Sequence, residues 1–240
     1  MPLPAPLSAW PRALRAPGQC AVCHGWAGET LCTVCIERFA APQPRCGRCG
    51  LRLAAPAPAC GACLADPPPF TACVVACDYG FPWDRLIAAF KFEGRVELAA
   101  PLSRRLVQAL HAADAALPDW VLPVPLAPLR LAERGYNQAW ELARRVADAL
   151  QRPCHAGVLQ RHADGTHQAA LGLAERRRNL RGAFIAQGTR QVSLHGAHVA
   201  VVDDVMTSGA TLAEAALALQ RAGVRRIDAW ALTRTPAPSA

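Results

Sequence analysis

The sequence contains no uninterrupted run of 18 apolar residues, which excludes an ordinary membrane-spanning helix. It also lacks the basic start and continuous apolar core of a secretory signal, because four prolines fall within the first 11 residues. We therefore expect a cytoplasmic protein that does not insert into membranes. Its 240 residues are enough for one main domain and a small additional module.

Lysine is nearly absent, since Lys91 is the single lysine among 26 basic residues. The formal net charge is +8, and the stretch 125–181 alone carries ten arginines against five acids. Excess positive charge attracts phosphate, either in a small metabolite or in a polynucleotide, but a solvated arginine-rich surface gives the same pattern. Few aromatic residues interleave with these arginines, chiefly Tyr136 and Trp140, so the pattern gives little support for stacking of nucleic-acid bases.

Cysteine, in contrast, is abundant, and 11 cysteines without an export signal favour metal ligation over disulfides. Eight of them form four Cys-x-x-Cys pairs, separated by eight, ten and ten residues. Each pair turns two sulfurs toward one point, and two pairs supply four thiolates for a tetrahedral zinc site. The sequence therefore predicts two structural zinc ions with no open coordination position. The simplest pairing is Cys20, Cys23, Cys32 and Cys35 for one site and Cys46, Cys49, Cys60 and Cys63 for the other; an interleaved pairing would serve equally well.

The cysteine pairs also divide the chain. Metal binding is expected to supply most of the folding energy of this module, since it lacks long amphipathic periodicity. Pro67, Pro68 and Pro69 predict a stiff connection after it. We expect a tail over 1–17, the cysteine-rich module over 18–66, a linker over 67–71 and a larger domain over 72–235. Loss of Cys46 and Cys49 should then leave the larger domain largely intact.

Beyond the linker, short apolar runs alternate with segments of helical periodicity. This alternation predicts an α/β domain with a parallel sheet flanked by helices on both faces. The expected strands are 72–79, 120–124, 158–159, 198–202 and 227–232, and the expected helices are 84–92, 97–113, 137–151 and 212–222. The remaining cysteines, Cys73, Cys77 and Cys154, stand in apolar surroundings and are predicted to be buried.

The segment 200–212, AVVDDVMTSGATL, is the most informative part of the chain. A buried strand leads into two acids, then into a turn of small residues, and then into a helix. In an open parallel sheet, ligands bind beyond the carboxyl ends of the strands. Backbone amides and hydroxyls at the start of a helix suit a phosphate group, and adjacent carboxylates suit the hydroxyls of a sugar. The alternative is that an aspartate caps the helix and Gly209 only permits the turn.

This segment resembles the signature of type I phosphoribosyltransferases, whose substrate is phosphoribosyl pyrophosphate. The resemblance implies that Asp203 and Asp204 hold the ribose hydroxyls, and that magnesium accompanies the pyrophosphate. It also implies a set of residues around the 5′-phosphate: Thr207, Ser208, Gly209, Ala210 and Thr211.

Further segments resemble the ComF family of competence-related proteins, over about residues 18–235. They are the stretches 121–126, 133–139 and 87–94, together with Gln168, Leu171, Asn179 and 182–184. The resemblance implies an N-terminal double zinc ribbon fused to a phosphoribosyltransferase-like domain, and a role in DNA uptake during natural transformation. DNA-uptake proteins and single-stranded DNA are the partners that it suggests.

Several polar residues near these segments have two interpretations each. Arg130 and Arg134 could bind pyrophosphate or be ordinary surface arginines, and Arg176 and Arg177 could belong to a closing lid or contact a polynucleotide. Asn137 could contact substrate or cap the helix that follows it.

Lys91 could form a structural salt bridge or contact substrate. Three functions therefore remain open: a phosphoribosyltransferase-type protein of DNA uptake, with or without turnover; a non-catalytic single-stranded nucleic-acid-binding protein on a vestigial transferase fold; and a nucleobase salvage enzyme.

Overall fold

The computed structural model describes residues 18–161 and 182–237. Contacts divide the chain into two compact units, 1–41 and 42–240. In the described part of the first unit, strand β1 (Gly18–Gln19) pairs antiparallel with β2 (Trp26–Ala27), and helix α1 (Thr33–Phe39) follows. The predicted tail, 1–17, lies outside the described residues.

The second unit begins with the segment 42–66, which we call the second ribbon. It contains an isolated bridge between Arg45 and Arg52 and the short helix α2 (Gly61–Ala65). The second ribbon thus shares a compact unit with the sheet that follows. The sequence could not indicate this grouping, because spacing reveals which cysteines can share a metal and not what their loops pack against. The boundaries at 66 and 72 stay a prediction.

Four parallel strands form the central sheet of the second unit. In spatial order they are β3 (Ala72–Asp78), β8 (Arg226–Arg234), β7 (His198–Met206) and β4 (Trp120–Pro123). All three pairings are parallel, and Val202 in β7 lies opposite both Pro123 and Trp230. The two inner strands are almost wholly buried, as expected for a sheet covered on both faces. The prediction of a parallel sheet is confirmed.

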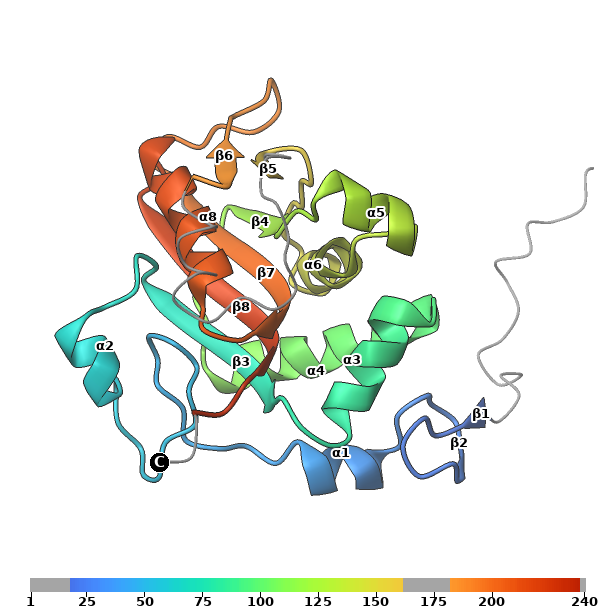
Figure 1. The fold of residues 1–240 in the computed structure, drawn as a ribbon. Helices are drawn as coiled ribbons and strands as arrows, with labels where there is room; N and C mark the ends of the chain where they lie inside the picture. The colour runs from blue at the N-terminus through green and yellow to red at the C-terminus, as the bar shows by residue number, and fades with distance from the viewer. Residues whose placement is uncertain (1–17, 162–181, 238–240) are drawn as a thin grey trace, which may run out of the picture. The chain divides into compact units, whose positions relative to one another are not determined.

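Helices cover both faces of this sheet (Figure 1). Helices α3 (Trp83–Phe92) and α4 (Ala99–Ala112) connect β3 to β4, with the 3₁₀ turn η3 (Val96–Leu98) between them. Helix α6 (Gln138–Ala149) packs beside α4, whereas α8 (Ala210–Arg221) packs on the opposite face, where its apolar side meets Val199 and Val201. The predicted helices are confirmed, with ends shifted by a few residues.

Two elements were not predicted from the sequence. Helix α5 (Pro128–Arg134) is only seven residues long, which is too short for apolar periodicity to mark it. Strand β6 (Phe184–Ala186) lies beside α8 and pairs antiparallel with β5 (Leu159–Arg161), whereas the sequence indicated only a strand at 158–159. Among the described residues, no helix is long and apolar enough to cross a membrane.

Candidate functional site

The eight predicted zinc ligands gather into two groups of four. The groups are Cys20, Cys23, Cys32 and Cys35 in the first unit and Cys46, Cys49, Cys60 and Cys63 in the second, and within each group all sulfurs lie within 4.8 Å of one another. The structure therefore selects the consecutive pairing over the interleaved one. All eight cysteines are free of disulfides.

The geometry of both clusters fits zinc. A tetrahedral site with Zn–S bonds of about 2.3 Å has sulfur–sulfur distances of about 3.8 Å. The Sγ atoms of Cys23 and Cys32 are 3.8 Å apart, and those of Cys49 and Cys60 are also 3.8 Å apart. Each cluster offers four thiolates, the full set of ligands for a tetrahedral zinc ion. Both clusters therefore match the closed structural sites of a double zinc ribbon, and neither leaves an open coordination position for catalysis.

Backbone amides prepare the sulfurs for metal binding. The N–H of Cys32 donates to Sγ of Cys20 at 3.4 Å, and the N–H of Cys60 donates to Sγ of Cys46 at 3.2 Å. Burial opposes ionisation of Cys20, but donors including Cys32 outweigh it and lower the pKa of this thiol to about 6. The same balance lowers the pKa of Cys46 to about 7. These thiols therefore ionise readily, which favours metal binding.

The predicted acid pair lies at the carboxyl end of β7, in the middle of the sheet. Asp204 is buried and Asp203 is half-buried, and the N–H of Asp204 donates to Oδ1 of Asp203 at 2.8 Å. Burial raises the pKa of Asp203 to about 7, and the charge of Asp204 adds to the effect. Two carboxylates so close together strain the site unless a cation or hydrogen-bond donors stabilise them.

Lys91, near the end of α3, supplies such a cation. Its Nζ atom lies 2.9 Å from Oδ1 of Asp204, and both side chains are largely buried, with exposed fractions of 18% and 9%. The charge of Lys91 lowers the pKa of Asp203, against the larger effect of burial. The sequence left Lys91 between a salt bridge and a ligand contact, and the structure places it in a salt bridge within the site.

The residues 207–211, which we call the phosphate turn, connect this acid pair to α8. Gly209 has a φ of 81°, in the left-handed region, and a Cβ atom added to it would lie 2.6 Å from Cε of Met206. Only glycine fits there without strain. Oγ of Ser208 accepts from the N–H of Ala210 at 3.3 Å, and α8 then runs for 12 residues behind the turn. Its first N–H groups give this end a partial positive charge.

The predicted pyrophosphate and lid residues have different outcomes. Arg130 is exposed on α5. The guanidinium of Arg134 stacks over the ring of Phe92, 4.9 Å from its centroid, and donates to Oε1 of Gln138 at 3.0 Å, which are the contacts of a structural role. Arg176 and Arg177 lie outside the described residues.

Asn137 caps α6, which confirms the simpler of its two interpretations. Its side-chain oxygen accepts from the N–H of Ala139 at 2.9 Å, and its Nδ2 donates to the carbonyl of Val124 at 3.0 Å. This cap fixes α6 to the segment that leaves β4. Asn137 thereby positions the start of the loop that carries Arg130.

Sequence reasoning missed two arginines at this end of the sheet. Arg161 ends β5; burial and then the charge of Arg130 lower its pKa, whereas Asp203 raises it. Arg234 ends β8, opposite Met206 in the register, and donates to the carbonyls of Met206 and Thr207. The rule that ligand sites form at the carboxyl ends of parallel strands could have indicated Arg234, since it follows a predicted strand.

The three cysteines outside the clusters differ in burial. Cys73 and Cys77 are buried in β3, as predicted, whereas Cys154 is only half-buried. Burial raises the pKa of the Cys154 thiol to about 12, which keeps it protonated and unreactive at neutral pH.

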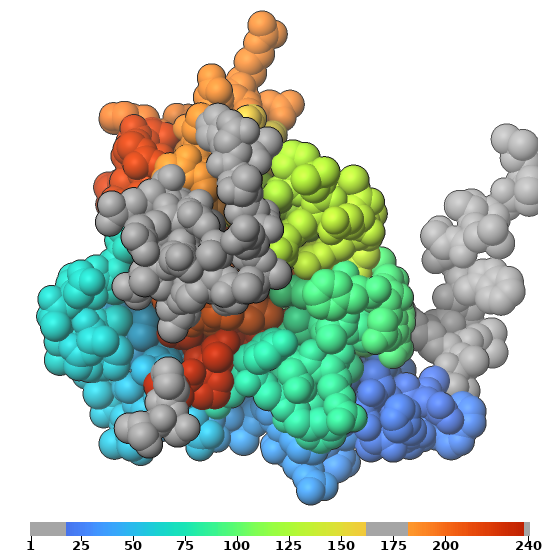
Figure 2. All heavy atoms as spheres, in the orientation of Figure 1, coloured from blue at the N-terminus to red at the C-terminus, as the bar shows by residue number. Residues whose placement is uncertain are grey.

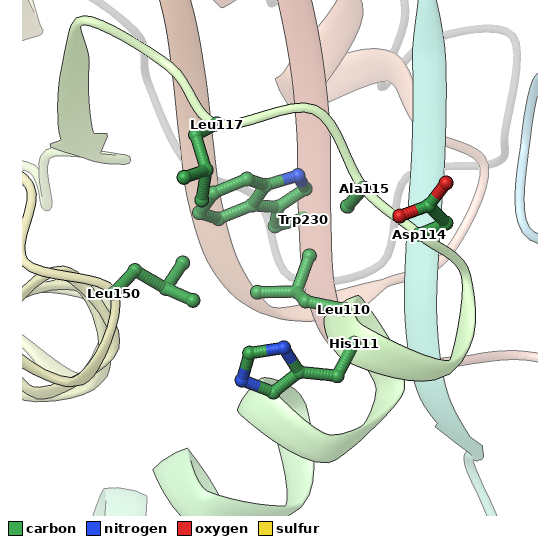
Figure 3. A pocket seen from close by; sticks show the side chains of 7 residues that line it. All are labelled: Leu110, His111, Asp114, Ala115, Leu117, Leu150 and Trp230. Atoms are coloured by element: carbon green, nitrogen blue, oxygen red, sulfur yellow. The ribbon is translucent and has the colours of Figure 1, made fainter.

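A small cavity lies away from the acid pair, beside the loop that precedes β4 (Figure 3). Its volume is about 60 Å³, far below the several hundred Å³ of an ordinary ligand pocket. Trp230, Leu110 and Leu150 are among the side chains that line it, together with His111 and Leu117. We assign it no ligand.

Comparison with known proteins identifies relatives over nearly the whole chain. DNA utilization protein YhgH of Escherichia coli is 35% identical over 231 residues, which cover 92% of this chain and 99% of the relative. Competence protein F of Haemophilus influenzae is 34% identical over 223 residues, covering 90% and 96%. No family model matches the chain.

Among solved structures, the Bacillus subtilis glutamine phosphoribosylpyrophosphate amidotransferase is 21% identical with a TM-score of 0.40, covering 59% of this chain and 30% of that one. The purine phosphoribosyltransferase of Pyrococcus horikoshii is 16% identical with a TM-score of 0.33, covering 56% and 70%. The sequence relatives are the stronger finding, because each match covers at least 90% of this chain. The chain, which joins two four-cysteine clusters of a double zinc ribbon to a parallel sheet, belongs to the ComF family of DNA-utilization and competence proteins.

Proposed function

We propose that this protein binds phosphoribosyl pyrophosphate with magnesium at the acid pair and the phosphate turn, and that it takes part in DNA uptake during natural transformation. The proposal rests on the order of the functional groups along the chain at the end of β7. A carboxylate pair is followed directly by a glycine-dependent turn and the positive end of a 12-residue helix. A sugar phosphate offers the complementary groups, hydroxyls beside an anion.

Different residues would bind the two parts of such a ligand, the ribose and the 5′-phosphate. Ribose hydroxyls donate to the carboxylates of Asp203 and Asp204, and the 5′-phosphate accepts from backbone N–H groups of the phosphate turn. Lys91 fixes the orientation of the Asp204 carboxyl group through the 2.9 Å salt bridge. The Asp204 carboxyl group therefore has a fixed position before the ligand arrives.

The pyrophosphate is proposed to lie toward Arg130 and Arg161. Arg161 is near enough to both Arg130 and Asp203 for their charges to affect its pKa, so cationic side chains flank the acid pair. Magnesium prefers oxygen ligands, and the acid pair offers carboxylate oxygens there. When bound, the ion would neutralise charge on the pyrophosphate. Arg134, Arg176 and Arg177 remain proposed as further contacts or as parts of a lid.

The DNA-uptake role is supported by the relatives named for DNA utilization and competence. A second candidate function is binding of single-stranded DNA without turnover, with the phosphate turn serving only as a platform. The same relatives and the exposed Arg130 favour it, since backbone phosphates are attracted to arginine without regard to sequence.

Calorimetric titration of the purified protein with phosphoribosyl pyrophosphate and magnesium, and in parallel with single-stranded DNA, tests these proposals. Replacing Asp203 and Asp204 together by Asn removes two charge-assisted hydrogen bonds of roughly 1.5–3 kcal/mol each. Binding of the sugar phosphate should weaken by about two to four orders of magnitude. DNA binding should hold or rise, because two negative charges are removed.

A matched control replaces Asp114 and Asp148, which are exposed near the ends of α4 and α6, by Asn. This pair changes the net charge equally and should leave sugar-phosphate binding unchanged. The absence of any affinity in the unmodified protein would refute the sugar-phosphate proposal. Loss of DNA binding alone in the Asp203/Asp204 variant would refute the ribose assignment.

A further inference from the structure

Arg234 connects the second ribbon to the phosphate turn. Its Nε donates to the carbonyl of the zinc ligand Cys49 at 3.2 Å. Its Nη1 donates to the carbonyls of Thr207, in the turn, and of Met206 at 3.3 Å. One planar guanidinium therefore holds a metal-binding loop and a ligand-binding loop at a fixed separation.

A second set of contacts, a backbone hydrogen bond followed by side-chain packing, joins the same two loops. The N–H of Cys73 in β3 donates to the carbonyl of Gly47, between the ligands Cys46 and Cys49. Sγ of Cys73 in turn contacts Sδ of Met206 at 3.8 Å, and Cε of Met206 fills the space beneath Gly209. Movement of the ribbon would thus reach the turn through packed side chains as well as through Arg234.

Several contacts fix the second ribbon to β3 and to the residue that precedes it. Arg45 forms a salt bridge of 2.7 Å with Asp78 at the end of β3, and Arg48 donates to the carbonyl of Thr71 at 2.9 Å. Gly50 lies so close to Val75 that an added Cβ would be 2.2 Å from its side chain. The space-filling view shows the end of β8, in red, beside the light-blue and cyan atoms of this segment (Figure 2).

We propose that the second ribbon is a support for the phosphate turn, and that Arg234 is the positioning residue through which zinc occupancy of the second cluster sets the affinity for the sugar phosphate. Without four metal-bound thiolates, the Cys49 carbonyl loses its fixed place, and Arg234 no longer holds the turn. The binding part of this inference rests on the proposed function. The structural part, an effect on the turn itself, does not.

The two cysteine clusters provide a matched pair of variants. Replacing Cys46 and Cys49 by Ser should remove one zinc per chain and weaken binding of phosphoribosyl pyrophosphate about tenfold, the equivalent of about 1.4 kcal/mol. Replacing Cys20 and Cys23 by Ser should also remove one zinc but leave this affinity unchanged, because that cluster lies in the other compact unit. Equal effects of the two variants, or no effect of the first, would overturn the proposal.

Substitutions of Arg234 distinguish the effect of its hydrogen bonds to both loops from the effect of its positive charge. Arg234→Gln should weaken binding about tenfold while both zinc ions remain bound. Arg234→Lys keeps the charge, but a single ammonium cannot contact both carbonyls, so it should bind as weakly as the Gln variant. Wild-type affinity in the Lys variant would show that only charge matters. In a double-mutant cycle, adding Arg234→Gln to the Cys46/Cys49 variant should cause no further loss; additive losses would contradict action through Arg234.

Two further measurements complement these: the first needs no ligand, and the second needs no variant. Hydrogen exchange of the ligand-free Gln variant should be faster at residues 206–210 than in the wild type, with unchanged exchange in β4. In the wild type, phosphoribosyl pyrophosphate should raise the zinc affinity of the second cluster in equilibrium competition with a chelator and leave that of the first cluster unchanged, because coupling between two binding affinities is reciprocal. Unchanged exchange at 206–210 would refute the support by Arg234, whereas failure of the wild type to bind the sugar phosphate would refute only the proposed function.

Discussion

Asp203→Asn is expected to stabilise the protein while it removes affinity for the proposed ligand. Burial and the neighbouring Asp204 raise the pKa of Asp203 from its usual 3.8 to about 7. Three pH units correspond to about 4 kcal/mol, an upper bound because Asp203 is half-buried and faces the charge of Lys91. We expect a gain of about 1–2 kcal/mol at neutral pH, since Asn keeps the oxygen that accepts from the N–H of Asp204.

The pH dependence identifies the cause of this gain. A folded-state pKa above the unfolded value means that the folded state holds the proton more tightly between about pH 4 and about pH 7, so wild-type stability falls as pH rises through this window. Asn has no proton to lose. Its advantage in urea denaturation should be small near pH 4, grow up to pH 7, and then stay constant.

Urea melts of both proteins at several pH values, with zinc present throughout, measure this difference directly. Asp114→Asn, at an exposed acid outside the site, is the control and should give no such trend. A stability difference that is independent of pH, or an Asn variant less stable than the wild type at pH 8, would refute the reasoning.

Three further predictions concern the turn, the helix cap and the metal. Gly209→Ala should lower the thermal midpoint and reduce sugar-phosphate affinity at least tenfold in titrations, because its φ of 81° and the 2.6 Å approach to Met206 both oppose a Cβ atom. Asn137→Ala should cost about 1 kcal/mol of unfolding free energy in urea melts, as loss of a helix cap does, and Asn137→Asp, which can still cap but cannot donate to the Val124 carbonyl, should recover only part of it. Elemental analysis should find about two zinc ions per chain, and zinc affinity measured with a chromogenic chelator should rise from about pH 6 to about pH 8. Burial and neighbouring thiols raise the pKa of Cys35 to about 12, so zinc must displace its proton; a pH-independent affinity would contradict thiolate ligation.

The sequence alone was sufficient for features that depend on local order along the chain. Cysteine spacing predicted two four-thiolate sites, because a Cys-x-x-Cys pair needs only its own turn to converge two sulfurs. Alternating strands and helices predicted the parallel sheet, and the segment 200–212 predicted an acid pair between a strand and a helix, since period and turn chemistry are local properties. The burial of Cys73 and Cys77 followed from their apolar neighbours.

Only the tertiary structure decided which distant residues share a site. Lys91 of α3 meets Asp204 of β7 across 113 positions in the sequence, and Arg234 of β8 meets Cys49 of the second ribbon across 185, because tertiary packing places α3 and this ribbon against the carboxyl ends of the two strands. The consecutive pairing of the cysteines and the place of the second ribbon in the sheet's own unit were likewise beyond spacing arguments. Local sequence specifies which groups can ionise, cap or bind a metal, but packing determines which of those groups face one another.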